Sequence, residues 1–399
     1  MSRPLSQSLE RYARRRFGLS GMSDVSQVFP FCRPIEAVRA TASGDNRSFV
    51  SFANYDYLGL ADDPRIRTSV QQAIDEVGVG VGASRLVGGE RQIHRELEAE
   101  MAAFLGVEDV LSLVSGYGTN VGLVGHLLTK DDLIVIDEAA HHSIMAGADL
   151  ARARSITFEH NDLQHLAEIL ASQRGEYARV LIIVEGLYSM DGDVPDLPNL
   201  LAICRRHDAW LMIDEAHSIG VLGETGRGIT EHFGIPTSDV DLIVGTFSKA
   251  FASCGGFIAA RQDVVDWLRF TLPSFVYSVG LPPPSAAAAR AALGVLEAEP
   301  ERLAALAANS LFFLTAAKGK GLNVGNAVGA GVVPVLFPDN ETTIAAARAA
   351  LEAGYFVPPI GQIAVPKDKP RLRFFVTSKH MTKDIEGVIQ ALVASEDRF

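Results

Sequence analysis

Two short segments of the chain carry side chains that could act together in one reaction. The segment DEAH at 214–217 follows one apolar run, and the segment GTFSK at 245–249 ends another. A pyridoxal cofactor needs a lysine for a Schiff base, a carboxylate beside its ring nitrogen and donors for its phosphate. A strand-end aspartate alone is often a helix cap, and a lone lysine is usually a solvated charge. The joint occurrence of Asp214, His217 and Lys249 therefore carries the hypothesis of pyridoxal chemistry.

A third segment supplies candidate donors for a phosphate. Ser115, Gly116 and Tyr117 come just before a stretch that we expect to be helical. Backbone N–H groups at a helix N-terminus point at an anion and favour its negative charge. Taken by itself, this segment is as typical of a plain turn as of a phosphate site.

The fold must bring these segments together in space. From about residue 46 to about residue 285, short apolar runs alternate with longer amphipathic stretches, which predicts parallel strands joined by helices in an α/β fold. Strands are predicted at 133–137, 180–185, 210–214 and 241–245. Ile93, Leu97, Met101 and Phe104 recur at the spacing of one helix face. Ligands in such sheets bind beyond the carboxyl ends of the strands, where the DEAH and GTFSK segments are expected.

The chain is predicted to have three parts: an N-terminal arm at 1–45, a large cofactor-binding domain at 46–285 and a small C-terminal domain at 286–399. The proline run at 282–284 interrupts regular structure, and the alanine-rich stretch after it should start a long helix. Strands at 332–337 and 371–377 and helices at 342–353 and 383–394 indicate that the small domain is α+β.

The composition favours chemistry on small molecules. A formal net charge of -12 argues against a nucleic-acid partner, because phosphate backbones are bound by clustered Lys and Arg. Cys32, Cys204 and Cys254 are too few and too widely spaced for a disulfide framework or a zinc knuckle. No segment approaches the roughly 20 apolar residues of a spanning helix, so we expect a cytoplasmic protein that is not an integral membrane protein.

An ordered set of motifs, from about residue 46 nearly to the C-terminus, resembles the α-oxoamine synthase family of pyridoxal-phosphate enzymes. The motifs are YDYLGL at 55–60, GASRLVGG at 82–89, SGYGTN at 115–120, DEAAHHS at 137–143, EGLYSMDGD at 185–193, DEAHSIG at 214–220, GTFSK at 245–249, LPP at 281–283 and RLRFFVTSKH at 371–380. The resemblance implies a fold type I aminotransferase-like fold with a mostly parallel central sheet. It also implies pyridoxal 5'-phosphate as cofactor and the decarboxylative condensation of an amino acid with an acyl-CoA or acyl-carrier-protein thioester to an α-amino ketone.

The resemblance implies catalytic roles for four residues. Lys249 matches the Schiff-base lysine, and Asp214 matches the partner of the ring nitrogen. His217 matches the group that bonds the ring hydroxyl, and His141 matches the imidazole stacked on the ring. A satisfied core histidine is the alternative interpretation of His141.

Further matches concern the phosphate and the neighbouring subunit. Ser189 matches a serine near the cofactor, although a purely structural hydroxyl fits equally well. Ser278 resembles a residue that reaches the phosphate of the neighbouring subunit, so we expect a homodimer. The phosphate contacts implied by the resemblance come from Thr246, Ser248 and the backbone of Gly116 and Tyr117.

Substrate choice is predicted from fewer residues. Arg373 matches the arginine that receives a substrate carboxylate, whereas Arg371, on the same strand face, is interpreted as a surface pair. Tyr55, Ser218 and Ser248 resemble the serine-using branch, the serine palmitoyltransferases, so L-serine is the first choice of donor and sphingolipid biosynthesis the implied setting. A usual Arg-Pro pair is replaced here by Gly361 and Gln362.

Three alternatives stay open. The same chemistry with glycine or alanine would make the chain similar to aminooxononanoate synthase or aminoketobutyrate ligase. Transamination on the same fold would release no carbon dioxide. A non-catalytic nucleotide-binding module would use Gly78, Gly80 and Gly82, but this run lacks GxGxxG spacing and follows a helix-like stretch instead of a strand.

Overall fold

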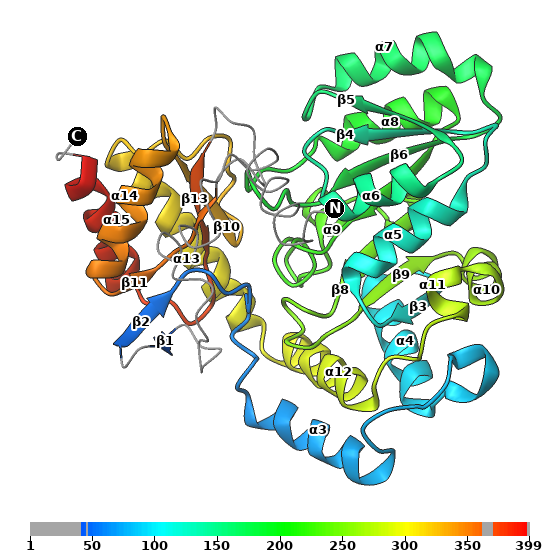
Figure 1. Ribbon diagram of the computed structural model, residues 1–399, viewed down its shortest axis with the longest axis horizontal. Coiled ribbons are helices and arrows are strands. Elements are labelled where there is room, and N and C mark those ends of the chain that lie inside the picture. Colours follow the sequence, from blue (N-terminus) through cyan, green and yellow to red (C-terminus); the bar gives the residue numbers. More distant parts are fainter. Residues whose placement is uncertain (1–40, 45–46, 361–369, 397–399) are drawn as a thin grey trace, which may run out of the picture. The chain divides into compact units, whose positions relative to one another are not determined.

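The computed structural model describes residues 41–44, 47–360 and 370–396 (Figure 1). The described chain forms two compact units. The large unit comprises Tyr55–Ala308 and Thr377–Lys379, and the small unit comprises the described residues before Tyr55, Asn309–Val376 and those from His380 onward.

The large unit is built on a seven-stranded sheet with the order β3-β9-β8-β7-β6-β4-β5. In this sheet β9 runs antiparallel to both of its neighbours, and the remaining pairs are parallel. The fold is therefore α/β with a mostly parallel sheet, as predicted. The strands are β3 Asp109–Leu113, β4 Leu133–Asp137, β5 Arg154–Phe158, β6 Val180–Glu185, β7 Trp210–Asp214, β8 Leu242–Thr246 and β9 Gly256–Ala260.

Continuous apolar sequence explains the central strands. Every residue of β4, β6 and β8 is buried, which is the pattern of parallel strands that are covered on both faces. The four strands predicted for this unit are confirmed, but β8 begins at Leu242 instead of Asp241. Asp241 instead accepts a hydrogen bond from the backbone N–H of Leu211 at 2.8 Å. Three further strands, β3, β5 and β9, had no separate prediction.

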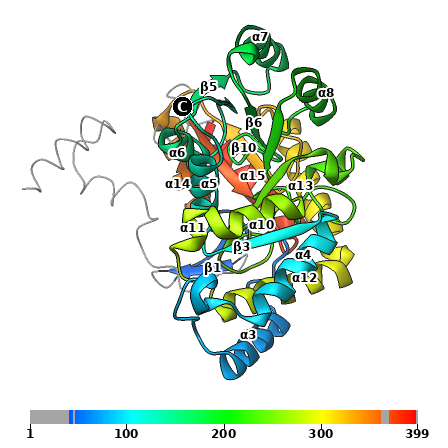
Figure 2. The ribbon, with the colours of Figure 1, turned by 90° about the vertical axis from the view of Figure 1, so that its right-hand side faces the viewer.

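Helices cover the sheet and extend from it (Figures 1 and 2). The residues Leu97, Met101 and Phe104 lie buried along α4, as the helical spacing predicted, and Ile93 is half-buried. The helices of this unit are α3 Pro64–Glu76, α4 Gln92–Leu105, α5 Gly116–Leu127, α6 His142–Leu150, α7 Leu163–Gln173, α8 Leu197–His207, α9 Ile229–His232, α10 Gln262–Thr271, α11 Pro273–Val276 and α12 Pro283–Ala298. The helix α13 Pro300–Gly319 starts in this unit and ends in the small one.

The described residues of the small unit form two three-stranded sheets and two further helices. One sheet has the order β1-β2-β11 and the other β10-β13-β12. Phe52, Phe313 and Phe374 pack together in its core, with ring centroids 4.8–6.0 Å apart. Its remaining elements are β1 Thr41–Gly44, β2 Arg47–Ser51, β10 Val332–Leu336, α14 Asn340–Glu352, β11 Tyr355–Phe356, β12 Pro359–Ile360, β13 Arg371–Phe375 and α15 Thr382–Glu396. The predicted strands and helices of the small domain are confirmed, with ends shifted by at most two residues.

The compact units do not follow the predicted domain limits. The long helix expected after the proline run exists as α12, yet it packs with the large unit instead of opening the small one. Arg290 on α12 forms ion pairs with Glu96 and Glu100 of α4. The hydroxyl of Ser69 on α3 donates to the Ala287 carbonyl at 3.3 Å. Because α12 is held on two helices of the large unit, the structural boundary falls after residue 308 and not near 285.

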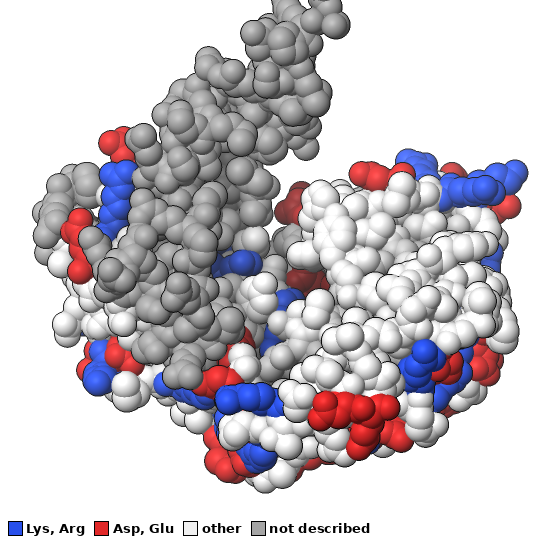
Figure 3. Space-filling view, turned by 60° about the horizontal axis from the view of Figure 1, so that its bottom comes forward, with Lys and Arg blue, Asp and Glu red and all other residues white. Residues whose placement is uncertain are grey.

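Charges of both signs share the surface. On the face in Figure 3, basic and acidic side chains lie close together near the rim, with a broad uncharged area between them. Among the described residues, no helix is long and apolar enough to cross a membrane, and no group of His, Cys, Asp and Glu could hold a metal ion.

Candidate active site

The predicted site residues of the large unit gather where its parallel strands end. Asp214 is the last residue of β7 and is 4% exposed. Its carboxylate accepts hydrogen bonds from Nδ2 of Asn120 at 2.7 Å and from the backbone N–H of Ala216 at 2.9 Å. These two donors stabilise a buried negative charge, which is what a partner for a protonated ring nitrogen requires.

His217 follows in the turn after β7 and is held by a residue that sequence reasoning did not assign. The hydroxyl of Tyr57 lies 2.7 Å from Nδ1 of His217, and both side chains are buried. Tyr57 belongs to the YDYLGL motif, so the motif marked its segment. Its partner lies 160 positions further along the chain, and no local pattern connects two residues so far apart.

Lys249 lies just beyond β8 and is half-buried. Its Nζ is 6.0 Å from the centre of the Tyr55 ring, which is 41% exposed. Lys249 and Tyr55, both predicted for the site, thus lie in one neighbourhood. The positive charge of Lys249 also acts on the buried carboxyl of Glu185 at the end of β6.

The N-terminus of α5 meets the end of β8 in a cradle for an anion. Ser115 caps the helix, its Oγ accepting from the backbone N–H of Gly118 at 3.1 Å. A Cβ on Gly116 would lie 2.7 Å from Oγ1 of Thr246, so only glycine leaves room there. Oγ of Ser248 lies 3.1 Å from the same Thr246 oxygen. Helix N–H groups and two hydroxyls thus converge, and these residues fit the phosphate of the cofactor.

His141 is the N-cap of α6 and not a core histidine. Its Nδ1 lies 2.7 Å from Oγ of Ser143, and the ring of Tyr117 packs edge-on at 6.1 Å. The hydroxyl of Tyr117 also lies 3.0 Å from Nδ1 of His142. His141, Tyr117 and the cap of α5 therefore form one wall of the site.

Three carboxyl groups lie next to one another at the strand ends. Glu185 pairs with Asp214 across β6 and β7, and Glu215 follows Asp214. Burial, followed by the charge of Asp214, raises the pKa of Glu185 to about 8, although Lys249 acts in the opposite direction. Burial likewise raises the pKa of Glu215 to about 7 against the hydrogen bond from Ser218. Sequence reasoning assigned a role to only Asp214 of the three.

An ion cluster fixes the loop that follows β6. His160 lies 2.9 Å from Asp137 and 3.0 Å from Asp193 through its two ring nitrogens. Burial alone would lower the pKa of His160, but the two carboxylates raise it to about 10. The loop so held carries Ser189, whose backbone N–H donates to Glu185 at 3.2 Å. This contact is made by the backbone of Ser189, so the role of its hydroxyl beside the cofactor stays a prediction.

Other predicted residues lie outside this group. Ser278 is half-buried, and its Oγ donates to the Val279 carbonyl at 3.3 Å. Arg373 lies on β13 of the small unit, with its guanidinium 4.5 Å from the Phe375 ring, so its role toward a substrate stays a prediction. Arg371 is 1% exposed, and its interpretation as a surface pair is wrong. Gly361 and Gln362 lie outside the described residues.

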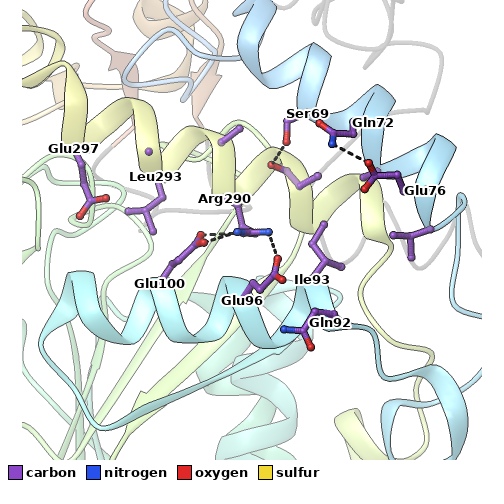
Figure 4. A pocket seen from close by; sticks show the side chains of 15 residues that line it. Ser69, Gln72, Glu76, Gln92, Ile93, Glu96, Glu100, Arg290, Leu293 and Glu297 are labelled. Carbon is purple, nitrogen blue, oxygen red and sulfur yellow. Dashed lines mark hydrogen bonds and ion pairs between the residues drawn. The ribbon is translucent and has the colours of Figure 1, made fainter.

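A hollow of about 750 Å³ elsewhere on the large unit is not this site (Figure 4). It lies among α3, α4 and α12, and its labelled side chains include Gln72, Glu96, Arg290 and Glu297. Arg290 is paired with Glu96 and Glu100, so its charge is compensated. None of the predicted site residues lines it.

The residues at the strand ends fit pyridoxal phosphate by chemistry. A lysine, a hydrogen-bonded buried carboxylate and an anion cradle are the three kinds of group that this cofactor requires, and His217 lies beside them. Lys249 would carry it, Asp214 and His217 would bond its ring, and the α5 N-terminus with Thr246 and Ser248 would hold its phosphate.

Comparisons with known proteins agree with this chemistry. A family model described as aminotransferase class I and II matches residues 47–392. The chain is 39% identical over 393 residues to an 8-amino-7-oxononanoate synthase of Methylobacterium nodulans, covering 98% of each chain. It is 35% identical over 367 residues to a serine palmitoyltransferase of Sphingobacterium spiritivorum, covering 92% of this chain and 91% of that one.

A solved structure extends the likeness to three dimensions. The serine palmitoyltransferase from S. paucimobilis, solved with bound PLP and myriocin, matches with a TM-score of 0.92 at 26% identity, covering 99% of each chain. The chain therefore belongs to the class I and II aminotransferase family and, within it, to the α-oxoamine synthases, acyltransferases that use pyridoxal phosphate to condense an amino acid with an acyl thioester and release carbon dioxide.

Proposed function

We propose that the amino-acid donor is alanine and that the product is of the 8-amino-7-oxononanoate type. In that product the amine on C8 lies beside a ketone on C7. Decarboxylative condensation keeps the α-carbon and side chain of the amino acid, so C8 and C9 come from alanine. The ketone carbon comes from the thioester, which is therefore a seven-carbon acyl group that ends in a carboxylate.

The observation that carries the choice of alanine is the position of Ser218. Its side chain is fully buried, and its hydroxyl donates to the carboxyl of Glu215. A Cβ on Gly186 would lie 2.5 Å from both this hydroxyl and Glu215, so the group is enclosed by backbone. Ser218 therefore serves the protein interior, and it does not supply a hydroxyl partner for a serine substrate. The 39% identity to the oxononanoate synthase, against 35% for the serine enzyme, supports the same choice.

Serine is the second candidate, and Tyr55 favours it. This half-exposed ring lies 6.0 Å from Nζ of Lys249, so its hydroxyl belongs to the same neighbourhood as the cofactor lysine. The TM-score of 0.92 to a serine palmitoyltransferase also favours serine. The setting in sphingolipid biosynthesis belongs to this second candidate.

The side chains of the site divide the chemistry among them. The cofactor, when bound, withdraws electrons from the bond that breaks at the α-carbon of the amino acid. Lys249, which would hold the cofactor, would also be the base that removes the α proton through its Nζ. Asp214 holds a negative charge, and the imidazole of His141 can polarise the thioester carbonyl. Proton transfer by a positioned group typically contributes about 10²–10⁴-fold in rate.

The substrate assignment is tested by kcat/KM for alanine, glycine and serine with one fixed acyl thioester. Alanine is expected to lead, and serine should lag because its hydroxyl gains no partner from Ser218. Ser218→Ala should leave the ratio of alanine to serine unchanged. A sharp preference for serine would transfer the assignment to the second candidate, and its loss in Ser218→Ala would show that Ser218 and not Tyr55 causes it. Measuring kcat/KM with the same acyl group attached to coenzyme A and to a carrier protein identifies which thioester the enzyme uses.

We also propose that the active unit is a homodimer. Two segments, at 79–87 and 277–280, lie side by side, since the backbone N–H of Gly280 donates to the Ala83 carbonyl at 3.1 Å. They expose apolar side chains on either side of Ser278, with Tyr277 87% and Val87 82% exposed. Large exposed apolar side chains in one region favour a protein partner. We call this set the apolar patch: Val79, Leu86, Val87, Tyr277 and Val279.

A further inference from the structure

Asn120 is a buried side chain of α5 that links two groups of the site. It is 3% exposed and lies a little over one turn beyond the N-cap Ser115. Its Nδ2 donates to Oδ2 of Asp214 at 2.7 Å and to Oγ of Ser143 at 3.0 Å. The Ser143 oxygen in turn lies 2.7 Å from Nδ1 of His141. One amide therefore connects the carboxylate at the end of β7 with the imidazole at the start of α6.

The partners of Asn120 fix the orientation of its amide. If oxygen and nitrogen exchanged places, Oδ1 would face the carboxylate of Asp214, and two acceptors would meet at hydrogen-bond distance. In the observed orientation both amide hydrogens are used, and Oδ1 has no hydrogen-bond partner among the described residues. The contact with Asp214 therefore determines that Asn120 donates both of its hydrogen bonds, to Asp214 and to Ser143.

The same direction continues to His141. Oγ of Ser143 accepts from Asn120 and lies 2.7 Å from Nδ1 of His141, to which it can donate its own proton. The backbone N–H of Ser143 also donates to Nδ1, at 3.3 Å. A ring nitrogen that accepts two hydrogen bonds carries no proton. These contacts favour the tautomer of His141 that has its proton on Nε2.

We propose that Asn120 is a positioning residue that sets the states of Asp214 and His141 together. By donating to Asp214 it stabilises the carboxylate, and through Ser143 it holds His141 as the neutral Nε2–H form. The family assigns Asp214 to the ring nitrogen and His141 to the ring face. An ionised Asp214 favours positive charge on the ring nitrogen, and a neutral imidazole, unlike an imidazolium, does not oppose that charge. This inference rests on the cofactor chemistry of the family and not on the choice of amino acid.

Three variants test separately the hydrogen bonds that connect Asp214, through Asn120 and Ser143, with His141. Asn120→Leu cuts both links, Ser143→Ala cuts only the link to His141, and Thr119→Val is the matched control. Thr119 is buried on the same helix, and its hydroxyl donates only to the Ser115 carbonyl, at 2.8 Å. The measured quantity is the dissociation constant of pyridoxal phosphate, from its absorbance on titration into cofactor-free protein.

We expect the dissociation constant to rise about tenfold or more in Asn120→Leu and about two- to threefold in Ser143→Ala. Thr119→Val should stay within about twofold of the wild type. The double variant with Asn120→Leu and Ser143→Ala should bind pyridoxal phosphate no more weakly than Asn120→Leu alone. Asn120→Leu already interrupts the hydrogen bonds that lead to His141. If the losses in free energy of cofactor binding from the two single variants add up in the double variant, Asn120 and Ser143 act independently and the proposal is wrong.

The tautomer of His141 is a second readout, independent of turnover. In protein with ¹⁵N-labelled histidine, the His141 signals are assigned by their loss in His141→Gln. Wild type and Thr119→Val should show an unprotonated Nδ1 and a protonated Nε2. Ser143→Ala keeps only the longer backbone donor to Nδ1, at 3.3 Å, and should show a larger fraction of the other tautomer. Should Asn120→Leu fail to fold, Ser143→Ala decides alone, and an unchanged His141 tautomer in that variant refutes the proposal.

Discussion

Charge compensation among neighbouring side chains is the main feature of the site at the residue scale. Asp214 receives two hydrogen bonds, whereas Oε1 of Glu185 has no hydrogen-bond partner among the described residues. Ionising two neighbouring buried carboxyl groups at once is unfavourable in free energy, because their negative charges repel each other. Burial and the neighbouring Asp214 therefore keep Glu185 protonated to a higher pH.

The raised pKa of Glu185 predicts a pH-dependent stability. Its pKa moves from the ordinary 4.5 to about 8 on folding, so the folded state binds the proton more tightly between these values. The free energy of unfolding should then fall as pH rises from about 4.5 to about 8. Glu185→Gln, which does not titrate, should gain in melting temperature relative to the wild type across this window.

Melting curves from pH 5 to pH 9 measure this effect. Glu176→Gln is the control, because Glu176 is exposed and lies outside the site. A difference between Glu185→Gln and wild type that is constant with pH, or that shrinks as pH rises, would contradict the assignment of Glu185 as the buried acid.

Individual residues were predictable where a local pattern marked them. Lys249, Asp214 and His217 each follow an apolar run, and the sequence identified them. Asn120 and Glu185 also stand inside recognisable motifs, but their roles come from partners on other strands and helices. Asp214 lies 94 positions from Asn120 along the chain, and only the fold brings them together.

At the scale of elements, the meeting of α5 with β8 defines the phosphate cradle. Gly116 allows the helix to start directly against Thr246. Gly116→Ala should close this space, because the added Cβ would lie 2.7 Å from the Thr246 oxygen. Loss of a hydrogen bond to a charged group corresponds to about a tenfold or greater rise in the dissociation constant of pyridoxal phosphate.

Gly118→Ala is the matched control on the same helix. A Cβ at Gly118 would lie 3.4 Å from its nearest neighbour, which is ordinary contact, so the affinity for the cofactor should hold. Cofactor titration of both variants makes the comparison. Equal affinity in Gly116→Ala and wild type would show that the phosphate is held elsewhere.

The elements themselves were predictable where their sequence was distinctive. The uninterrupted apolar runs of β4 and β6 identified them, and the alanine-rich run after the prolines identified α12. The strand β9 has the equally apolar sequence GFIAA, but nothing in it indicates an antiparallel direction. The boundary between the two units could not be predicted from local sequence either. It depends on the packing of α12 against α4, where Arg290 pairs with Glu96 and Glu100.

For the whole molecule, the apolar patch predicts that dimer formation and activity go together. Val87→Asp places a charge in the patch and should shift the protein to monomer, with activity falling in step. Leu150→Asp changes another exposed apolar residue, 67% exposed at the end of α6, and should leave the dimer intact. Light scattering under assay conditions measures both, and a strictly monomeric species with full activity would refute the homodimer.

The decarboxylative condensation itself is tested most directly by following the carboxyl carbon of the amino acid. Purified protein is supplied with pyridoxal phosphate, an acyl thioester and alanine or serine labelled in its carboxyl carbon. The label should leave as carbon dioxide in a one-to-one ratio with released thiol and α-amino ketone, and Lys249→Ala should release none. Retention of the label in a product, or formation of a keto acid without thiol release, would contradict the assigned reaction.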